Sequence, residues 1–139
     1  MKATELMIGD WVLINNASHK IQLIDSIDAE IQADDELYYV GEDRFNSRDK
    51  IEGIPVTEDF FIENDWEHVC RTYLQKSFIK NVGKSHLQII NNNLYIWFDY
   101  SPDDWNQDPN VKVPIKYIHD MQHILRLCEL DELANNFKV

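Results

Sequence analysis

The chain has few of the residues from which covalent frameworks and phosphate-binding loops are built. Its 139 residues include two cysteines, four glycines and four prolines. Cys70 and Cys128 lie far apart and form no CxxC pair, so we expect neither a disulfide framework nor a cysteine-rich zinc site. The glycines are isolated and match no glycine-rich phosphate-binding pattern, which argues against a nucleotide cofactor. We therefore predict no cofactor, and free thiols in a reducing compartment.

Long hydrophobic runs are missing as well. No apolar stretch approaches the roughly 18 residues that a bilayer-spanning helix needs. Residues 1–9 lack the basic start and the apolar core of a secretory signal. We expect a soluble protein of the cytoplasm with no membrane partner.

Basic residues are scarce relative to acidic ones. The chain has 13 Lys and Arg against 25 Asp and Glu, a formal net charge of −12. Such a surplus of negative charge repels phosphate backbones and anionic membrane surfaces over most orientations. The charge therefore predicts no direct binding to nucleic acid.

The acidic residues are concentrated in the segment Asp25–Glu52, which we call the acidic rim. It contains ten Asp and Glu against three basic residues, Arg44, Arg48 and Lys50. A charge run of this kind is most often a solvated surface that keeps a protein soluble. The rim also fits the surface of a basic partner, and the sequence leaves both interpretations open.

Large apolar side chains are plentiful. Hydrophobic residues make up 44% of the chain, and four Trp, six Tyr and six Phe supply the surfaces that a folded core needs. A chain of this length fits one domain. We predict a single domain over residues 1–139, with a β-rich half over 1–56 and a helix-hairpin-helix half over 57–139.

The β-rich half contains short apolar or alternating segments separated by polar turns. Four strands are expected, at Asp10–Ile14, Ile21–Ile27, Glu30–Ala33 and Leu37–Val40. Short strands in this arrangement are typical of a small, curved antiparallel sheet. The pattern predicts an SH3-like barrel.

The second half combines helices with a hairpin. Thr57, followed by two acidic residues, resembles a helix start, so we predict a helix over about 57–64. The clearest hairpin places strands at Leu87–Ile90 and Leu94–Phe98 around an Asn-rich turn. Further strands are expected at 66–74, 78–82 and 111–114, and a second helix at about 116–130. The fold class is therefore α+β with a mainly antiparallel sheet.

The helix at 116–130 is amphipathic. Its apolar side contains Tyr117, Ile118, Met121, Ile124, Leu125 and Cys128. The side expected to lie away from the core contains Lys116, His119, His123, Arg126 and Glu129. The helix is therefore predicted to cover a core with its apolar side.

The same helix contains a metal-like motif. His119 and His123 have the i, i+4 spacing of zinc-protease histidines, but Asp120 stands where those enzymes have the general-base Glu. No third ligand with a recognisable spacing follows. His119 and His123 are the metal candidates, and a structural amphipathic helix is the competing interpretation.

No catalytic nucleophile stands out. Cys128 lies on the apolar side of the last helix. Cys70 falls in an expected strand, where His68, two residues away, shares its face and the adjacent Arg71 does not. We predict no catalytic residues and no cofactor-binding residues. The sequence does not favour an enzyme.

Three pieces of the chain together resemble a known family. They are Leu6-Met7-Ile8-Gly9-Asp10-Trp11-Val12, Ile51-Glu52-Gly53-Ile54-Pro55-Val56-Thr57-Glu58 and the run from Tyr117 to Cys128. In order and spacing they resemble a family of short uncharacterised proteins from gut anaerobic bacteria and their phages or other mobile elements. Family members usually have Pro where this chain has Gly53. The resemblance implies a small intracellular protein of mobile-element origin and supplies no activity.

These observations favour a protein-interaction or accessory module that binds another protein through a sheet edge or the acidic rim. A second hypothesis is an acidic decoy that inhibits a nucleic-acid-binding protein. A third is a metal-dependent hydrolase that uses His119 and His123.

Overall fold

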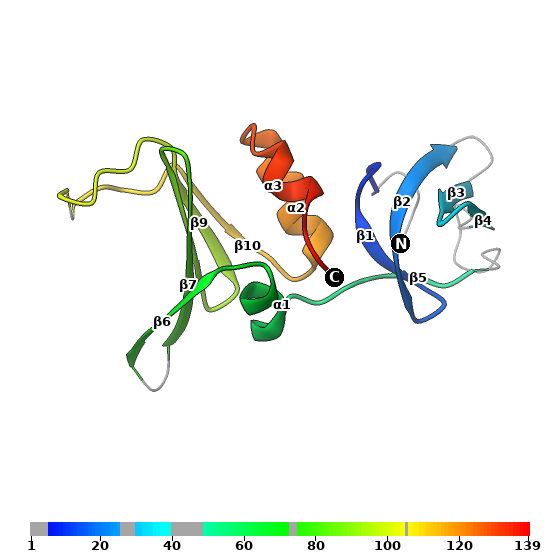
Figure 1. The fold of residues 1–139 in the computed structure, drawn as a ribbon, viewed down its shortest axis with the longest axis horizontal. Coiled ribbons are helices and arrows are strands. Elements are labelled where there is room, and N and C mark those ends of the chain that lie inside the picture. Colours follow the sequence, from blue (N-terminus) through cyan, green and yellow to red (C-terminus); the bar gives the residue numbers. More distant parts are fainter. Residues whose placement is uncertain (1–5, 26–29, 40–48, 73–74, 105) are drawn as a thin grey trace. The chain divides into compact units, whose positions relative to one another are not determined.

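The computed structural model describes residues 6–25, 30–39, 49–72, 75–104 and 106–139. Two five-stranded antiparallel sheets and three short helices make up the fold (Figure 1), which confirms the α+β prediction. The chain divides into two compact units. Unit 1 comprises Met1–Pro55, Tyr117–Phe137 and Val139, and unit 2 comprises Val56–Lys116 and Lys138.

The sheet of unit 1 has the strand order β4-β3-β2-β1-β5 and is coloured blue to green in Figure 1. Its strands are β1 (Trp11–Ile14), β2 (Ala17–Asp25), β3 (Glu30–Ala33), β4 (Glu36–Tyr39) and β5 (Ile51–Gly53). Alternate side chains form one buried cluster, as expected for strands with one face on a core. Its members are Leu6, Val12, Ile14, Ile21, Ile31, Ala33 and Ile51.

Two-residue turns connect two of the hairpins of this sheet. Asn15 and Asn16 join β1 to β2, and Asp34 and Asp35 join β3 to β4, all four with positive φ. Positive φ at both turn residues matches the right-handed twist of the flanking strands, and Asn and Asp tolerate it better than most residues. The Asn and Asp pairs therefore position the strands without glycine.

The predicted SH3-like barrel is not confirmed. In the described part of the chain β4 and β5 are the two edges of the first sheet, and neither sheet closes on itself. A barrel needs a complete hydrogen-bonded ladder between its first and last strands, and β5 has only three residues. Ile27 and Val40, which we expected in strands, lie outside the described residues.

Two helices complete unit 1, α2 (Ile118–Leu127) and α3 (Asp131–Asn135). The helix predicted over about 116–130 is present but shorter, since it begins at Ile118 and a turn after Leu127 separates α2 from α3. The Tyr117 backbone N–H donates to Asp120 Oδ2 at 3.0 Å and caps the start of α2. Glu129 has a φ of +60°, and Leu130 donates back to the Leu125 carbonyl at 2.8 Å, a Schellman-type ending that stops the helix.

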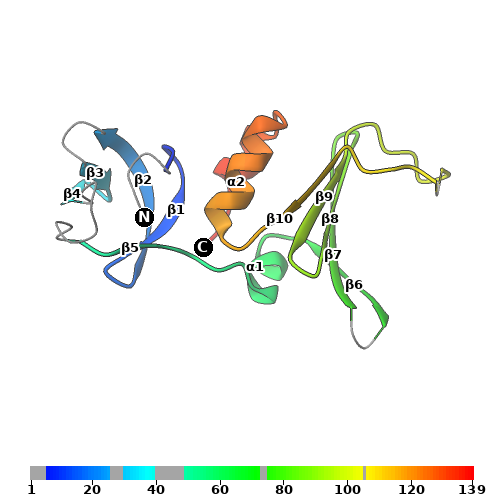
Figure 2. The same ribbon diagram turned by 180° about the vertical axis from the view of Figure 1, so that it is seen from behind.

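Unit 2 contains α1 (Glu58–Glu63) and a second sheet of order β10-β9-β8-β7-β6. The strands are β6 (Glu67–Thr72), β7 (Gln75–Val82), β8 (Ser85–Ile90), β9 (Asn93–Trp97) and β10 (Val111–Pro114), and Figure 2 shows this sheet from behind. The helix at 57–64, the hairpin and the strands at 66–74, 78–82 and 111–114 are confirmed, except that Tyr73 and Leu74 lie outside the described residues. Thr57 Oγ1 accepts the Phe60 N–H at 3.2 Å and caps α1 as predicted.

Aromatic rings attach α1 to the second sheet. The Phe61 ring stacks on Phe78 at 4.9 Å and meets Trp66 edge-on at 5.4 Å. The same face of the sheet contributes Leu87, Ile89, Leu94 and Ile96, all buried. A helix of six residues is too short to be stable alone, so this packing is what maintains it.

The C-terminal helices group with the N-terminal sheet. The sequence interpretation placed residues 117–137 in the same half as the hairpin, whereas their contacts assign them to unit 1. The single-domain prediction itself stays a prediction. The grouping places the three pieces that carry the family resemblance largely in one unit.

Candidate functional site

The segment around Asp10 meets α2 in a buried polar cluster. The Asp10 side chain is fully buried, and it accepts the Met7 backbone N–H at 2.8 Å. Its two oxygens also pair with α2, since His123 Nε2 lies 2.6 Å from Oδ2 and Arg126 Nη1 lies 2.6 Å from Oδ1. The buried carboxylate therefore has a cationic partner and two further donors, as a buried charge requires.

Gln122 provides a second buried connection. Its side chain is fully buried, with Oε1 accepting the Trp11 backbone N–H at 3.0 Å. Its Nε2 donates to the Gly9 and Ala134 carbonyls, each at 3.0 Å. One amide thus links the start of β1, α2 and α3, and both of its polar atoms are satisfied.

Gly9 lies against this cluster in a backbone conformation that favours glycine. Its φ is +91°, and an added Cβ would lie 3.0 Å from Arg126 Nη2. The same nitrogen donates to Asn135 Oδ1 at 3.3 Å. A larger residue at position 9 would therefore disturb the guanidinium that neutralises Asp10.

Gly53 is needed for a different close approach. An added Cβ would lie 2.4 Å from Tyr117 Cγ, because the Tyr117 ring covers this glycine. Nearby, Ile118 donates its backbone N–H to the Ile54 carbonyl at 2.8 Å, and Pro55 and Tyr117 form an isolated β-bridge. All three pieces that carry the family resemblance thus contact one another in unit 1.

The metal candidate His119 is buried, and its predicted place away from the core is wrong. It is 6% exposed, its ring stacks on Tyr117 at 5.5 Å and meets His123 edge-on at 5.7 Å. The prediction failed because an amphipathic pattern shows only the apolar side of a helix. Here part of the polar side is also covered, since His119 and Gln122 are buried.

The arrangement of the two histidines does not assemble a metal site in the described residues. His123 points Nε2 at Asp10, and His119 Nε2 lies 3.6 Å from Asp120 Oδ1. Among the described residues no group of three His, Cys, Asp or Glu side chains could hold a metal ion. The metal hypothesis stays a prediction, and stoichiometric zinc in untagged protein, lost in His119→Ala, is the result that would support it.

Among the described residues, no nucleophile hydrogen-bonds to the His123–Asp10 pair. The free thiol on the same helix, Cys128, is half-buried, and burial raises its pKa, which keeps it protonated near neutral pH. Arg126 shares the Asp10 carboxylate with His123. The cluster is therefore suited to fixing α2 against β1 as a structural network. The sequence did not predict it, because no spacing rule links residues 10 and 126.

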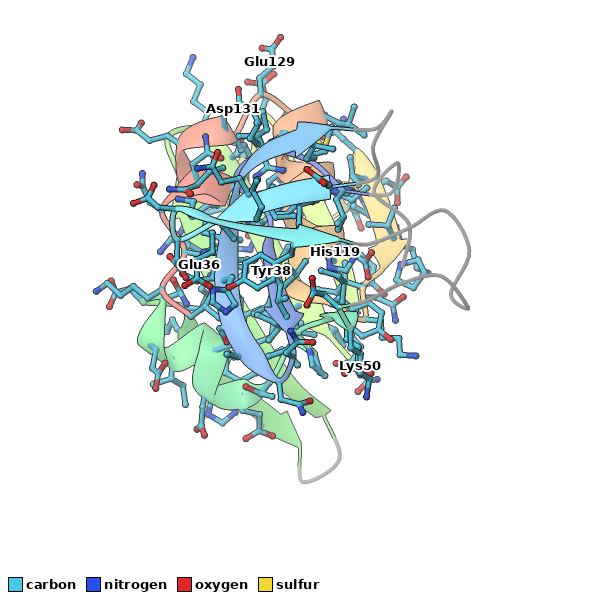
Figure 3. The ribbon with its side chains drawn as sticks, turned by 90° about the vertical axis from the view of Figure 1, so that its right-hand side faces the viewer. Glu36, Tyr38, Lys50, His119, Glu129 and Asp131 are labelled. Carbon is cyan, nitrogen blue, oxygen red and sulfur yellow. The ribbon has the colours of Figure 1, made fainter. Side chains whose placement is uncertain are left out.

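The acidic surplus belongs almost entirely to unit 1. This unit contains 16 of the 25 acidic residues and six of the 13 basic ones, a formal charge of −10 out of −12. Exposed carboxylates lie at the β3–β4 turn (Asp34, Asp35 and Glu36) and around the α2–α3 turn (Glu129, Asp131 and Glu132). Figure 3 labels Glu36, Glu129 and Asp131, which are exposed residues of this unit.

Comparisons of the chain with known protein families, curated proteins and solved structures found no match. Across the described residues, no helix has both the length and the apolar character needed to cross a bilayer. Function is therefore argued from the surface of the chain itself.

Proposed function

We propose that this protein is a protein-interaction or accessory module whose unit 1 binds a basic protein partner. The observation that carries the proposal is the uneven division of charge, −10 in unit 1 against −2 in unit 2. A surface with one sign of charge accelerates encounter with an oppositely charged partner and rejects like-charged ones. Binding of this kind needs no catalytic group.

The acidic surface is a better docking site than the β10 edge of the second sheet. On edge strand β10, Lys112 is exposed and Pro114 ends the strand. Charged side chains and proline are the features by which proteins prevent strand addition at an exposed edge. Between this edge and the acidic rim, we therefore favour the acidic rim as the binding surface.

The SH3-like arrangement, the mobile-element origin, the cytoplasmic location and the decoy role are further parts of this proposal. The pairing of β5 with β1 supports an SH3-like arrangement of the first sheet, although the sheet is open. A mobile-element origin and a cytoplasmic location rest on the sequence resemblance and composition. An acidic decoy is the special case in which the basic partner is a nucleic-acid-binding protein.

The test is an affinity pull-down from a lysate of the source organism, washed in parallel at about 0.1 M and about 1 M salt. We expect a stoichiometric basic protein that the high-salt wash removes. Competition by added DNA or RNA would identify the decoy case. A partner that survives high salt would contradict the acidic docking surface, and the absence of any partner would contradict the interaction module.

A further inference from the structure

A cluster of titratable and aromatic side chains lies at the acidic β3–β4 turn. His19 on β2 hydrogen-bonds through Nδ1 to Asp34, a residue of the turn. The Tyr38 hydroxyl on β4 donates to Glu36 Oε2 at 3.1 Å, and Figure 3 shows both residues on this strand. The His19 and Tyr38 rings are 5.5 Å apart. Two carboxylates and two rings therefore converge from β2, the β3–β4 turn and β4.

The cluster is half-open to solvent. Tyr38 packs against the core of the first sheet, and the His19 side chain is 16% exposed. Asp34 is 65% exposed and Glu36 is exposed. The rings are thus fixed by packing while the carboxylates remain accessible, which is the arrangement of a preorganised binding site rather than of a mobile charge run.

Several carboxylates act on the Tyr38 hydroxyl. Burial, the hydrogen bond to Glu36 and the negative charges of Glu36, Asp34 and Asp49 raise the pKa of Tyr38. Asp34 and Glu36 have no Lys or Arg within ion-pair distance in the described part of the chain. Apart from His19, which is charged only when protonated, no described cationic side chain therefore compensates the local charge.

An arginine side chain fits this combination better than a metal ion does. No metal-binding group of three ligands occurs among the described residues. A guanidinium is planar and weakly hydrated, stacks on aromatic faces and forms charge-assisted hydrogen bonds with carboxylates. The lysine ammonium is compact and strongly hydrated, so it stacks on a ring and bridges two separate carboxylates less well.

We propose that the cluster of His19, Asp34, Glu36 and Tyr38 is the anchor point of unit 1, where an arginine side chain of the basic partner binds against Tyr38 and pairs with Asp34 and Glu36. This inference rests on the proposed function and identifies the place and the residue type of the contact.

The test uses the full-length chain and two synthetic probes, an oligo-arginine peptide and a length-matched oligo-lysine peptide. Binding is measured by calorimetry at low salt, and the contact is located by amide chemical shifts in NMR. The test variant is Asp34→Asn/Glu36→Gln. The matched control is Asp131→Asn/Glu132→Gln, which removes the same charge from the same unit at α3.

The proposal predicts that oligo-arginine binds more tightly than oligo-lysine and shifts amides around His19, Asp34 and Tyr38. The test variant should weaken oligo-arginine binding about tenfold and the control by no more than about twofold. Equal weakening in both variants would overturn the anchor and leave the acidic interaction module standing. Failure of the parent chain to bind either peptide would overturn both.

Discussion

At the residue scale, the fold of unit 1 depends on a few side chains whose importance the sequence does not reveal. Asp10 reads as a turn residue before a strand, and the prediction of a strand there was right. Its burial and its pairing with His123 and Arg126 are long-range facts that composition and periodicity do not encode. The same is true of Gln122, which appears in the sequence as an ordinary polar helix residue.

Arg126 is expected to contribute more to the stability of unit 1 than any other cationic side chain. Arg126→Met would leave the fully buried Asp10 without its cationic partner, and we expect a loss of about 3 kcal/mol in the free energy of unfolding. Urea denaturation followed by tryptophan fluorescence measures this. Lys50→Met is the control, because Lys50 is 66% exposed in its pair with Glu52 and such pairs contribute at most about 1 kcal/mol. Equal losses in the two variants would refute the assigned role of the cluster.

The close packing of the Tyr117 ring on Gly53 can be tested by adding a methyl group. Gly53→Ala places a methyl group 2.4 Å from the Tyr117 ring, so ring or backbone must shift, at a cost of about 2 kcal/mol. Gly83→Asn is the comparison, since Gly83 has a φ of +58°, open space around it and a conformation that Asn tolerates. Thermal unfolding should show a clear decrease in Tm only for Gly53→Ala. A Tm close to that of the parent would mean that the Tyr117 ring does not lie on this glycine.

His86 gives unit 2 a pH-dependent stability. It is 4% exposed, its ring stacks on Tyr100 at 4.1 Å, and burial lowers its pKa. The unfolded chain therefore binds more protons than the folded chain once the pH falls below the ordinary value of about 6.5, so the free energy of unfolding falls with pH from there. His86→Gln should remove this part of the pH dependence in denaturant melts between about pH 7.5 and 5. Parallel pH profiles for the variant and the parent would contradict it.

At the scale of elements, local chemistry predicted most of the structure. Thr57 caps α1 where expected, and the Asn-rich turn joins β8 to β9, because caps and turns depend on neighbours in the chain. The end of α2 was missed, since the pattern continues through Cys128 while Glu129 adopts a positive φ that sequence alone does not signal. Barrel closure was also beyond reach, because it depends on pairing between distant strands.

The end of α2 offers a stabilising substitution. Glu129 adopts φ +60° at the position after the helix cap, where glycine is favoured. Glu129→Gly should raise the free energy of unfolding by about 0.5–1 kcal/mol, because glycine adopts this conformation without steric cost. Glu129→Ala removes the same charge but keeps the strain, so it should give no comparable gain. If both variants gain equally in urea melts, relief of charge repulsion and not backbone strain would be the cause.

At the scale of the whole molecule, the main result is the division of the chain into two units with very different charge. Unit 1 carries −10, and unit 2 is nearly balanced at −2. The sequence predicted a concentration of acids between Asp25 and Glu52, but not that the C-terminal helices, with Glu129, Asp131 and Glu132, belong to the same unit. That grouping depends on contacts such as Gln122 with Gly9, which join residues far apart in the chain.

The central claim, that unit 1 binds a basic partner through its acidic surface, is tested most directly by the salt dependence of the dissociation constant of the purified complex. We predict that affinity falls steeply as ionic strength rises from about 0.05 M to 0.5 M, because exposed charges are screened over this range. An affinity that does not change with salt would contradict the account and assign the interaction to apolar contacts instead.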